Sequence, residues 1–73
     1  MARFKAVQVR IETADPTGRV EYYQARGKKD AAKKVLYTRR LKDGRCKLGP
    51  TGLVVSCSDG MAWVIMKHEG YER

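Results

Sequence analysis

The sequence predicts an α+β fold: a single domain with two β-hairpins and one amphipathic helix in the order ββαββ, the helix packed on a mainly antiparallel sheet. Three observations predict this fold. Apolar residues alternate near the N-terminus, good helix formers follow in the middle, and two β-rich runs joined by Asp59-Gly60 lie near the C-terminus. Because the chain has 73 residues, we expect residues 1–73 to form one domain with one small core.

The first hairpin is predicted from residues 4–25. Val7, Val9 and Ile11 share one face of residues 4–13, and mainly polar side chains share the other, which is the period of a half-buried strand. Turn-forming residues follow at 14–18, and residues 19–25 are again β-rich. Because such a loop does not fix the register, the sequence leaves open whether Tyr22 or Tyr23 faces the core.

A helix is predicted to begin at Lys28, because Gly27 ends the second strand and good helix formers follow it. Asp30 lies in the expected first turn, where a carboxylate is favourable to the helix dipole, and Asp43-Gly44 provides the stop. With a rotation of about 100° per residue, the stripe expected to face the sheet consists of Ala31, Ala32, Val35 and Leu36. The opposite side carries Lys29, Lys33, Tyr37 and Arg40.

The closing hairpin is the clearest local signal in the chain. Residues 53–58 and 61–66 are β-rich, and the Asp59-Gly60 pair between them favours a two-residue type I′ turn. This turn predicts that Val55 lies opposite Val64 and that Ser56 lies opposite Trp63. The side expected to pack on the helix consists of Leu53, Val55, Cys57, Ala62, Val64 and Met66. Residues 45–52, before this hairpin, are expected to form a basic loop.

The net charge of +8 comes entirely from residues 26–47, which hold ten of the sixteen basic residues and two of the acids. Charge confined to one segment makes a directed field that orients an acidic partner. The candidate basic face comprises Lys29, Lys33, Tyr37, Arg40, Arg45 and Lys47. Nucleic-acid phosphate, in RNA or DNA, and an acidic protein surface both fit this face. Only Tyr37 offers a stacking ring within it, which argues against sequence-specific RNA binding.

The other side of the closing hairpin is more apolar than a solvated sheet face requires. Its apolar members are Val54, Met61, Trp63 and Ile65, which accompany Ser56 and Ser58. One interpretation is that the edge of the first hairpin or the C-terminal tail covers this side. The other is a partner-binding face, because Trp, Met and Ile among small polar groups are typical anchors of protein interfaces.

No catalytic constellation is found in the sequence, so we expect neither enzymatic activity nor a cofactor. His68 is the single histidine and lies beside Glu69 near the terminus, which favours a surface role over acid–base chemistry. Cys46 and Cys57 are expected to be reduced thiols, because one pair makes no disulfide framework and no secretion signal accompanies it. Two cysteines and one histidine at these positions match no usual zinc spacing, so no metal site is predicted.

The N-terminal residues lack the apolar region of a secretion signal, and the longest apolar run, residues 61–66, is far shorter than a membrane-spanning helix. We therefore expect a soluble, cytoplasmic protein without membrane contact, and we expect a monomer. Residues 68–73 are polar and are expected to form a flexible tail, with Tyr71 as the one candidate anchor.

The helix segment ARGKKDAAKKVLYTRRLK and the closing hairpin LVVSCSDGMAWVIM, in a chain of this length, resemble small transcription regulators of lytic bacteriophages. These regulators, of the Xanthomonas phage type, bind host bacterial RNA polymerase. The resemblance covers the whole chain and rests on length and general character. It implies binding to the N-terminal segment of the polymerase β′ subunit near the RNA exit channel, in the host cytoplasm. It also implies inhibited initiation through sigma displacement and, with NusA, antitermination at intrinsic terminators.

Two functions follow from the sequence. The first is a phage regulator that takes over host transcription by non-catalytic steric and electrostatic binding to RNA polymerase. The alternative is a basic nucleic-acid-binding module that contacts phosphates through its helix and the following loop. A third hypothesis, a small nuclease, has only His68 to support it.

Overall fold

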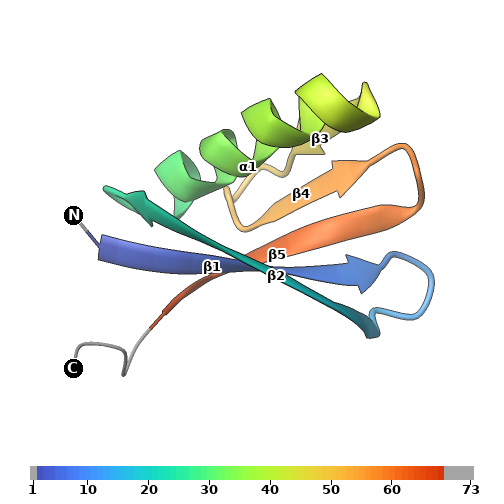
Figure 1. Cartoon of the computed structure of the whole chain (residues 1–73), viewed down its shortest axis with the longest axis horizontal. Helices are drawn as coiled ribbons and strands as arrows, with labels where there is room; N and C mark the ends of the chain where they lie inside the picture. Colours follow the sequence, from blue (N-terminus) through green and yellow to red (C-terminus); the bar gives the residue numbers. More distant parts are fainter. Residues whose placement is uncertain (1, 69–73) are drawn as a thin grey trace.

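One helix packs on a five-stranded antiparallel sheet, which confirms the predicted α+β class (Figure 1). The computed structural model describes residues 2–68, and within the helix it describes the backbone but not the side chains of residues 40–43. The elements are β1 (Ala2–Arg10), β2 (Pro16–Ala25), α1 (Lys28–Asp43), β3 (Cys46–Leu48), β4 (Val54–Cys57) and β5 (Met61–Lys67). In the described part of the chain, no helix is long and apolar enough to cross a membrane.

The strands lie in the order β2-β1-β5-β4-β3, so the first and last strands of the chain pair at the centre of the sheet. The helix lies along one face of this sheet, which we call the inner face, and we call the opposite face the outer face (Figure 1). The beginning of β1, the end of β2 and the beginning of α1 lie at one end of the molecule. The β1–β2 loop and the β4–β5 turn lie at the other end.

The register of the first hairpin decides between its two tyrosines. Phe4 lies opposite Tyr23, and Lys5 lies opposite Tyr22. Because Phe4 is buried on the inner face, alternation places Tyr23 on the inner face and Tyr22 on the outer face. Val7 shares the outer face with Tyr22, and the pairing is irregular between Val7 and Val9.

The predicted basic loop contains the short edge strand β3, which the sequence did not reveal. Cys46 lies directly opposite Cys57, with the two Cα atoms 4.1 Å apart, and a disulfide joins the two residues. The prediction of two reduced thiols was therefore wrong. That prediction rested on the lack of a larger cysteine framework. Residues that pair directly on neighbouring antiparallel strands are nevertheless close enough to form a single disulfide.

The predicted register of the closing hairpin was wrong by one residue. Val55 lies opposite Trp63, where Val64 was expected. Only Gly60 has a positive φ (85°) in this turn, and its N–H donates to the Cys57 carbonyl, so the loop is a type I turn followed by a left-handed glycine. Such a loop contains three residues, Ser58 to Gly60. The additional residue rotates every side chain of β5 to the opposite face from the one predicted.

The core lies between α1 and the inner face. Trp63, Ile65, Val35 and Val55 are its largest fully buried side chains. The helix contributes mainly small residues, and Ala31 and Ala32 are fully buried. A helix face of this kind can lie close to the sheet, so that the indole of Trp63 fills the space beneath it.

The sheet continues one residue further towards the C-terminus than expected. The His68 N–H donates a hydrogen bond to the Arg3 carbonyl (2.9 Å). Position 68 of the predicted flexible tail is thus bound to β1. The rest of that predicted tail, including Tyr71, lies outside the described residues.

Candidate functional site

The start of α1 is fixed by local hydrogen bonds that also set the direction of its basic side chains. The Ala31 N–H donates to the Gly27 carbonyl, and Asp30 Oδ2 accepts from the Arg26 N–H (3.1 Å). A carboxylate that reaches back in this way satisfies a backbone donor before the helix, as in a capping box, and favours the positive end of the helix dipole. The predicted start at Lys28 is confirmed.

Lys29, Lys33 and Tyr37 form one row on the exposed side of α1, as predicted. All three are exposed, and Tyr37 retains 65% of its accessible surface. This row lies on the side of the helix nearest the β3–β4 loop, because Gly52 of that loop packs against Lys29. A Cβ at Gly52 would lie 3.1 Å from the Lys29 Cα, so glycine permits this close approach. The side chain of Arg40, the fourth predicted residue of this face, lies outside the described residues.

Two basic residues of the charged segment 26–47, Lys34 and Arg39, make contacts within the fold. Lys34 Nζ donates to the Gln24 carbonyl (2.6 Å) and so connects α1 to β2. Arg39 is only 4% exposed and lies over the core, with its guanidinium carbon 5.3 Å from the Trp63 ring centroid. Arg39 therefore contributes much less to the field outside the protein than its place in the sequence suggested.

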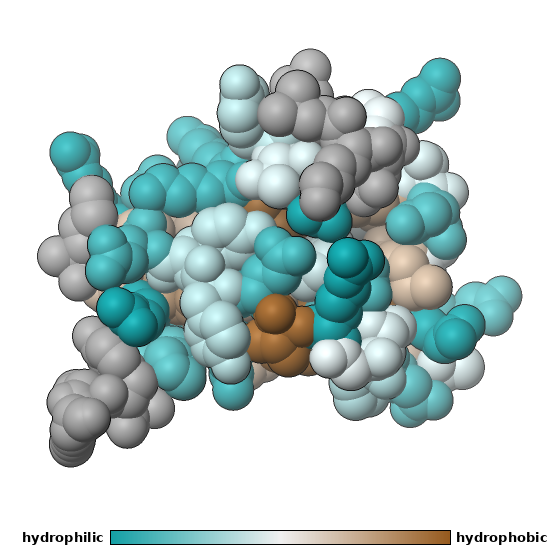
Figure 2. Space-filling model, viewed as in Figure 1, coloured by the Kyte–Doolittle hydropathy of each residue, from teal (hydrophilic) through white to brown (hydrophobic). Residues whose placement is uncertain are grey.

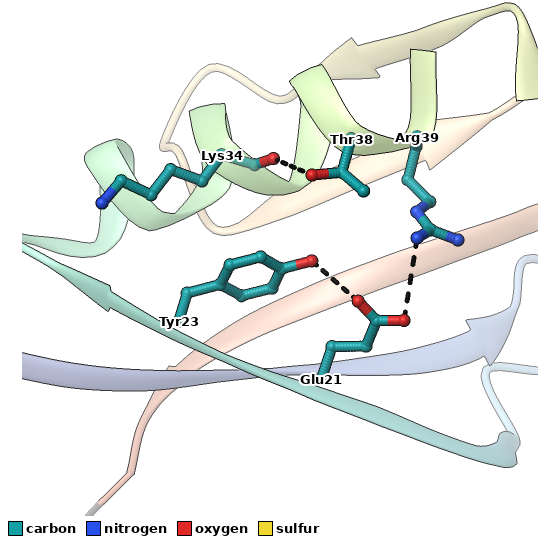
Figure 3. Close-up of polar contacts among 5 residues, drawn as sticks. All are labelled: Glu21, Tyr23, Lys34, Thr38 and Arg39. Carbon is teal, nitrogen blue, oxygen red and sulfur yellow. Dashed lines mark hydrogen bonds and ion pairs between the residues drawn. The ribbon is translucent and has the colours of Figure 1, made fainter. Parts of the chain in front are cut away.

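A polar cluster surrounds Arg39 between α1 and β2 (Figure 3). Arg39 Nη2 lies 3.7 Å from Glu21 Oε2, and the Tyr23 hydroxyl donates to Glu21 Oε1 (2.9 Å). Arg39 Nε has no hydrogen-bond partner among the described residues. Burial raises the pKa of Tyr23 to about 12, and the hydrogen bond to Glu21 and the Glu21 charge act in the same direction. These contacts join the helix to the sheet and hold the Arg39 guanidinium inside the fold, away from an external ligand.

Arg45 and Lys47 are both exposed and belong to the β3 edge of the sheet. Lys47 lies opposite Ser56, on the outer face. An open hollow of about 350 Å³ lies beside them. It is lined by Ile11, Arg45, Lys47, Ser56, Cys57 and Ser58. Ammonium, guanidinium and hydroxyl groups around a hollow can bind an anion such as a phosphate. The sequence indicated the two cations but not this hollow, because β3 was not predicted.

The predicted apolar face does not exist as one surface. Trp63 is 1% exposed and Ile65 is also buried, both beneath α1. Met61 is half-buried on the same side of β5, whereas Val54 is exposed on the outer face. The helix covers Trp63, whereas the sequence had offered the first hairpin or the tail for that role. The cause is the three-residue turn described above.

The outer face carries an aromatic pair that the sequence did not indicate. Tyr22 is 58% exposed, and its ring centroid lies 5.0 Å from that of His68, with an angle of 62° between the planes. Lys5 lies beside Tyr22 on the neighbouring strand. The two rings come from segments far apart in the chain, and only the pairing of β1 with both β2 and β5 brings them together.

Exposed cations are the main candidate binding groups among the described residues. No three His, Cys, Asp or Glu side chains among them converge on a point that could hold a metal ion. Hydrophilic side chains cover most of the face shown in Figure 2, and strong hydrophobic colour is confined to small areas. Comparisons with protein-family models, with curated proteins and with solved structures found no match for this chain.

Proposed function

We propose that this protein is a non-catalytic module that binds the phosphate backbone of a nucleic acid. The observation that carries the proposal is the exposure of Lys29 and Lys33 on α1 and of Arg45 and Lys47 at β3, which we call the basic surface. The helix row lies beside the β3–β4 loop, and Lys47 lies on the outer face, so these cations flank the β3 edge from two sides. A polyanion that follows this edge can contact both groups.

The local balance of charge supports this function. Asp30 follows Lys29 in α1, and its carboxylate accepts a hydrogen bond from the Arg26 N–H. Glu21, the acid that pairs with Arg39, lies on β2 at the opposite edge of the sheet from β3. Among the described residues no ion pair joins Lys29, Lys33, Arg45 or Lys47 to a carboxylate, so these cations retain their attraction for phosphate.

The double substitution Lys29→Glu plus Lys33→Glu tests this proposal. We expect the affinity for a labelled nucleic acid to fall, and the slope of log affinity against log salt to become shallower. For each phosphate that the variant no longer neutralises, the slope changes by about 0.9 on duplex DNA and by about 0.7 on a single strand. The matched control is Arg10→Glu plus Arg19→Glu, which makes the same charge change at exposed positions near the β1–β2 loop. Equal decreases in affinity for both variants would show attraction by net charge alone and would reject a defined basic surface.

A second candidate function is the regulator of host RNA polymerase that the resemblance implies. It is supported by β2, a ten-residue strand at the edge of the sheet whose side chains are mostly exposed. An extended segment of a partner, such as the N-terminal segment of β′, can pair with such an edge. This function no longer has the support of an exposed Trp63.

Purified bacterial RNA polymerase tests the second candidate. We expect the protein to bind polymerase after nuclease treatment, to inhibit initiation by the holoenzyme and, with NusA, to increase readthrough of an intrinsic terminator. Polymerase capture that disappears on nuclease treatment would instead indicate a shared nucleic acid and would favour the first proposal.

A further inference from the structure

The outer face of the sheet is not covered by the helix and combines an aromatic pair with lysines. Lys5 lies between Tyr22 on β2 and Met66 on β5, and these two side chains are exposed. The neighbouring Tyr22 and His68 rings form an edge-to-face pair. Tyr22 nevertheless keeps more than half of its surface open to solvent. A ring held in this way has lost part of its freedom before any ligand arrives, which lowers the entropic cost of binding.

The outer face continues from this corner towards the hollow beside β3. Val7 pairs with Val64, and Val64 pairs with Val54, so a band of β-branched side chains crosses the middle of the sheet. Ser56 and Lys47 lie beyond it, at the opposite corner. Among the outward positions of the described strands, none is Asp or Glu. The surface therefore has an aromatic and cationic group at one corner and a cationic group with hydroxyls at the other.

We infer that this outer face binds a single-stranded nucleic acid, with a base stacked on Tyr22 and phosphates held by Lys5 and Lys47. The inference rests on the proposed nucleic-acid binding and narrows its ligand to single strands. Unpaired bases expose the ring faces that an aromatic side chain can stack on, whereas a duplex hides them. A strand that crosses from Tyr22 to the hollow would place its sugars and bases over the valine band.

Charge complementarity favours this ligand over a second copy of the protein. Two copies packed outer face to outer face would bring Lys5 and Lys47 of each copy into a shared apolar layer with no carboxylate from the outward strand positions to pair them. Desolvating unpaired ammonium groups is costly. A polyanion supplies the opposite charge and leaves the lysines paired.

The experiment measures fluorescence anisotropy of a labelled oligouridine of about eight nucleotides, a length that one small fold can span. Its duplex with oligoadenosine serves as the comparison. We expect the single strand to bind more tightly than the duplex. Tyr22→Ala should weaken single-strand binding about 5- to 150-fold, the range measured when one stacked ring is removed. Tyr22→Phe should restore it, because the ring faces remain.

Tyr37→Ala is the matched control, since Tyr37 is also a highly exposed tyrosine but lies on α1. We expect Tyr37→Ala to weaken single-strand binding less than Tyr22→Ala does, because Tyr37 lies in the helix row beside Lys29 and Lys33 and not on the outer face. A 5-iodouracil-substituted strand should crosslink to Tyr22, as identified by mass spectrometry. Crosslinking to Tyr37, or weaker binding with Tyr37→Ala and unchanged binding with Tyr22→Ala, would overturn the inference.

The outcomes separate this inference from the proposed function. If Tyr22→Ala has no effect while Lys29→Glu plus Lys33→Glu still weakens binding, the inference fails and phosphate binding stands. If neither oligonucleotide binds the parent protein, both fail. A dimer in sedimentation experiments that Tyr22→Ala dissociates would also overturn the inference, because the outer face would then belong to a second copy.

Discussion

The inner and outer faces of the sheet both carry many apolar side chains, but among the described elements a helix covers only the inner face. On the inner face, Phe4 and Trp63 lie beneath a helix whose buried residues include Ala31 and Ala32. On the outer face, Lys5 lies between Tyr22 and Met66, which are both exposed, and α1 does not cover them. On the inner face, large rings are paired with small helix residues, so the two layers pack closely. On the outer face, burying the ammonium group of Lys5 under a second layer without a partner would be costly.

The largest test of this comparison substitutes neighbouring residues of β5 that point to opposite faces. Trp63→Ala should lower the free energy of unfolding by about 3–5 kcal/mol, because it leaves a cavity beneath α1 and removes the ring under Arg39. Val64→Ala, on the half-buried outer face, should cost only about 1 kcal/mol. Urea unfolding followed by far-ultraviolet circular dichroism measures both. Equal decreases would contradict the assignment of the two faces.

A smaller effect is expected at the turn that determines which face each residue of β5 occupies. Gly60 has φ 85°, and no atom lies within 4 Å of the position where its Cβ would stand. Gly60→Ala should therefore cost only the backbone penalty of a left-handed residue, about 1–2 kcal/mol. Gly60→Asn should cost less, because asparagine tolerates this conformation. Thermal unfolding measures the order of stability of the parent and the two variants. If Gly60→Ala were as stable as the parent, the turn with a left-handed Gly60 would be disproved.

The sequence predicted the elements of this hairpin but not its register, and the reason lies in β3. When only the hairpin is considered, Asp59-Gly60 between two β-rich runs fits a two-residue turn as well as it fits the three-residue turn of the structure. In the structure, the Ser58 N–H donates to the Arg45 carbonyl, so the first residue of the turn is bound to the chain just before β3. A three-residue strand with basic residues around it gives too weak a signal for sequence periodicity. Placing Trp63, the largest apolar side chain, in the core would have selected the correct register.

The candidate site was predictable to the extent that it lies on the helix. The helical period alone placed Lys29, Lys33 and Tyr37 on the exposed side, and the structure confirms their exposure. The same period places Arg39 four residues after Val35, on the buried stripe. The Tyr22–His68 pair could not be found in this way, because it depends on the pairing of β1 with two strands that are far apart in the chain.

The smallest effect concerns Tyr23, whose ring lies on the inner face although the adjacent Tyr22 lies on the outer face. Burial and the bond to Glu21 raise the pKa of Tyr23 to about 12 in the folded protein, compared with 10.0 for an ordinary tyrosine. The folded state therefore favours the protonated hydroxyl. The stability that this group contributes is fully present below about pH 10 and disappears as the pH rises towards about 12.

Tyr23→Phe isolates this contribution from the titration of the other tyrosines and the lysines. The difference in free energy of unfolding between the parent and Tyr23→Phe should be constant at neutral pH and should change in favour of the variant as the pH rises from about 10 to about 12. Guanidinium unfolding at a series of pH values measures this difference. A difference that stays constant throughout that interval would show that Tyr23 is not held against Glu21. The helix and β2 would then be joined by Arg39 and Lys34 without the tyrosine.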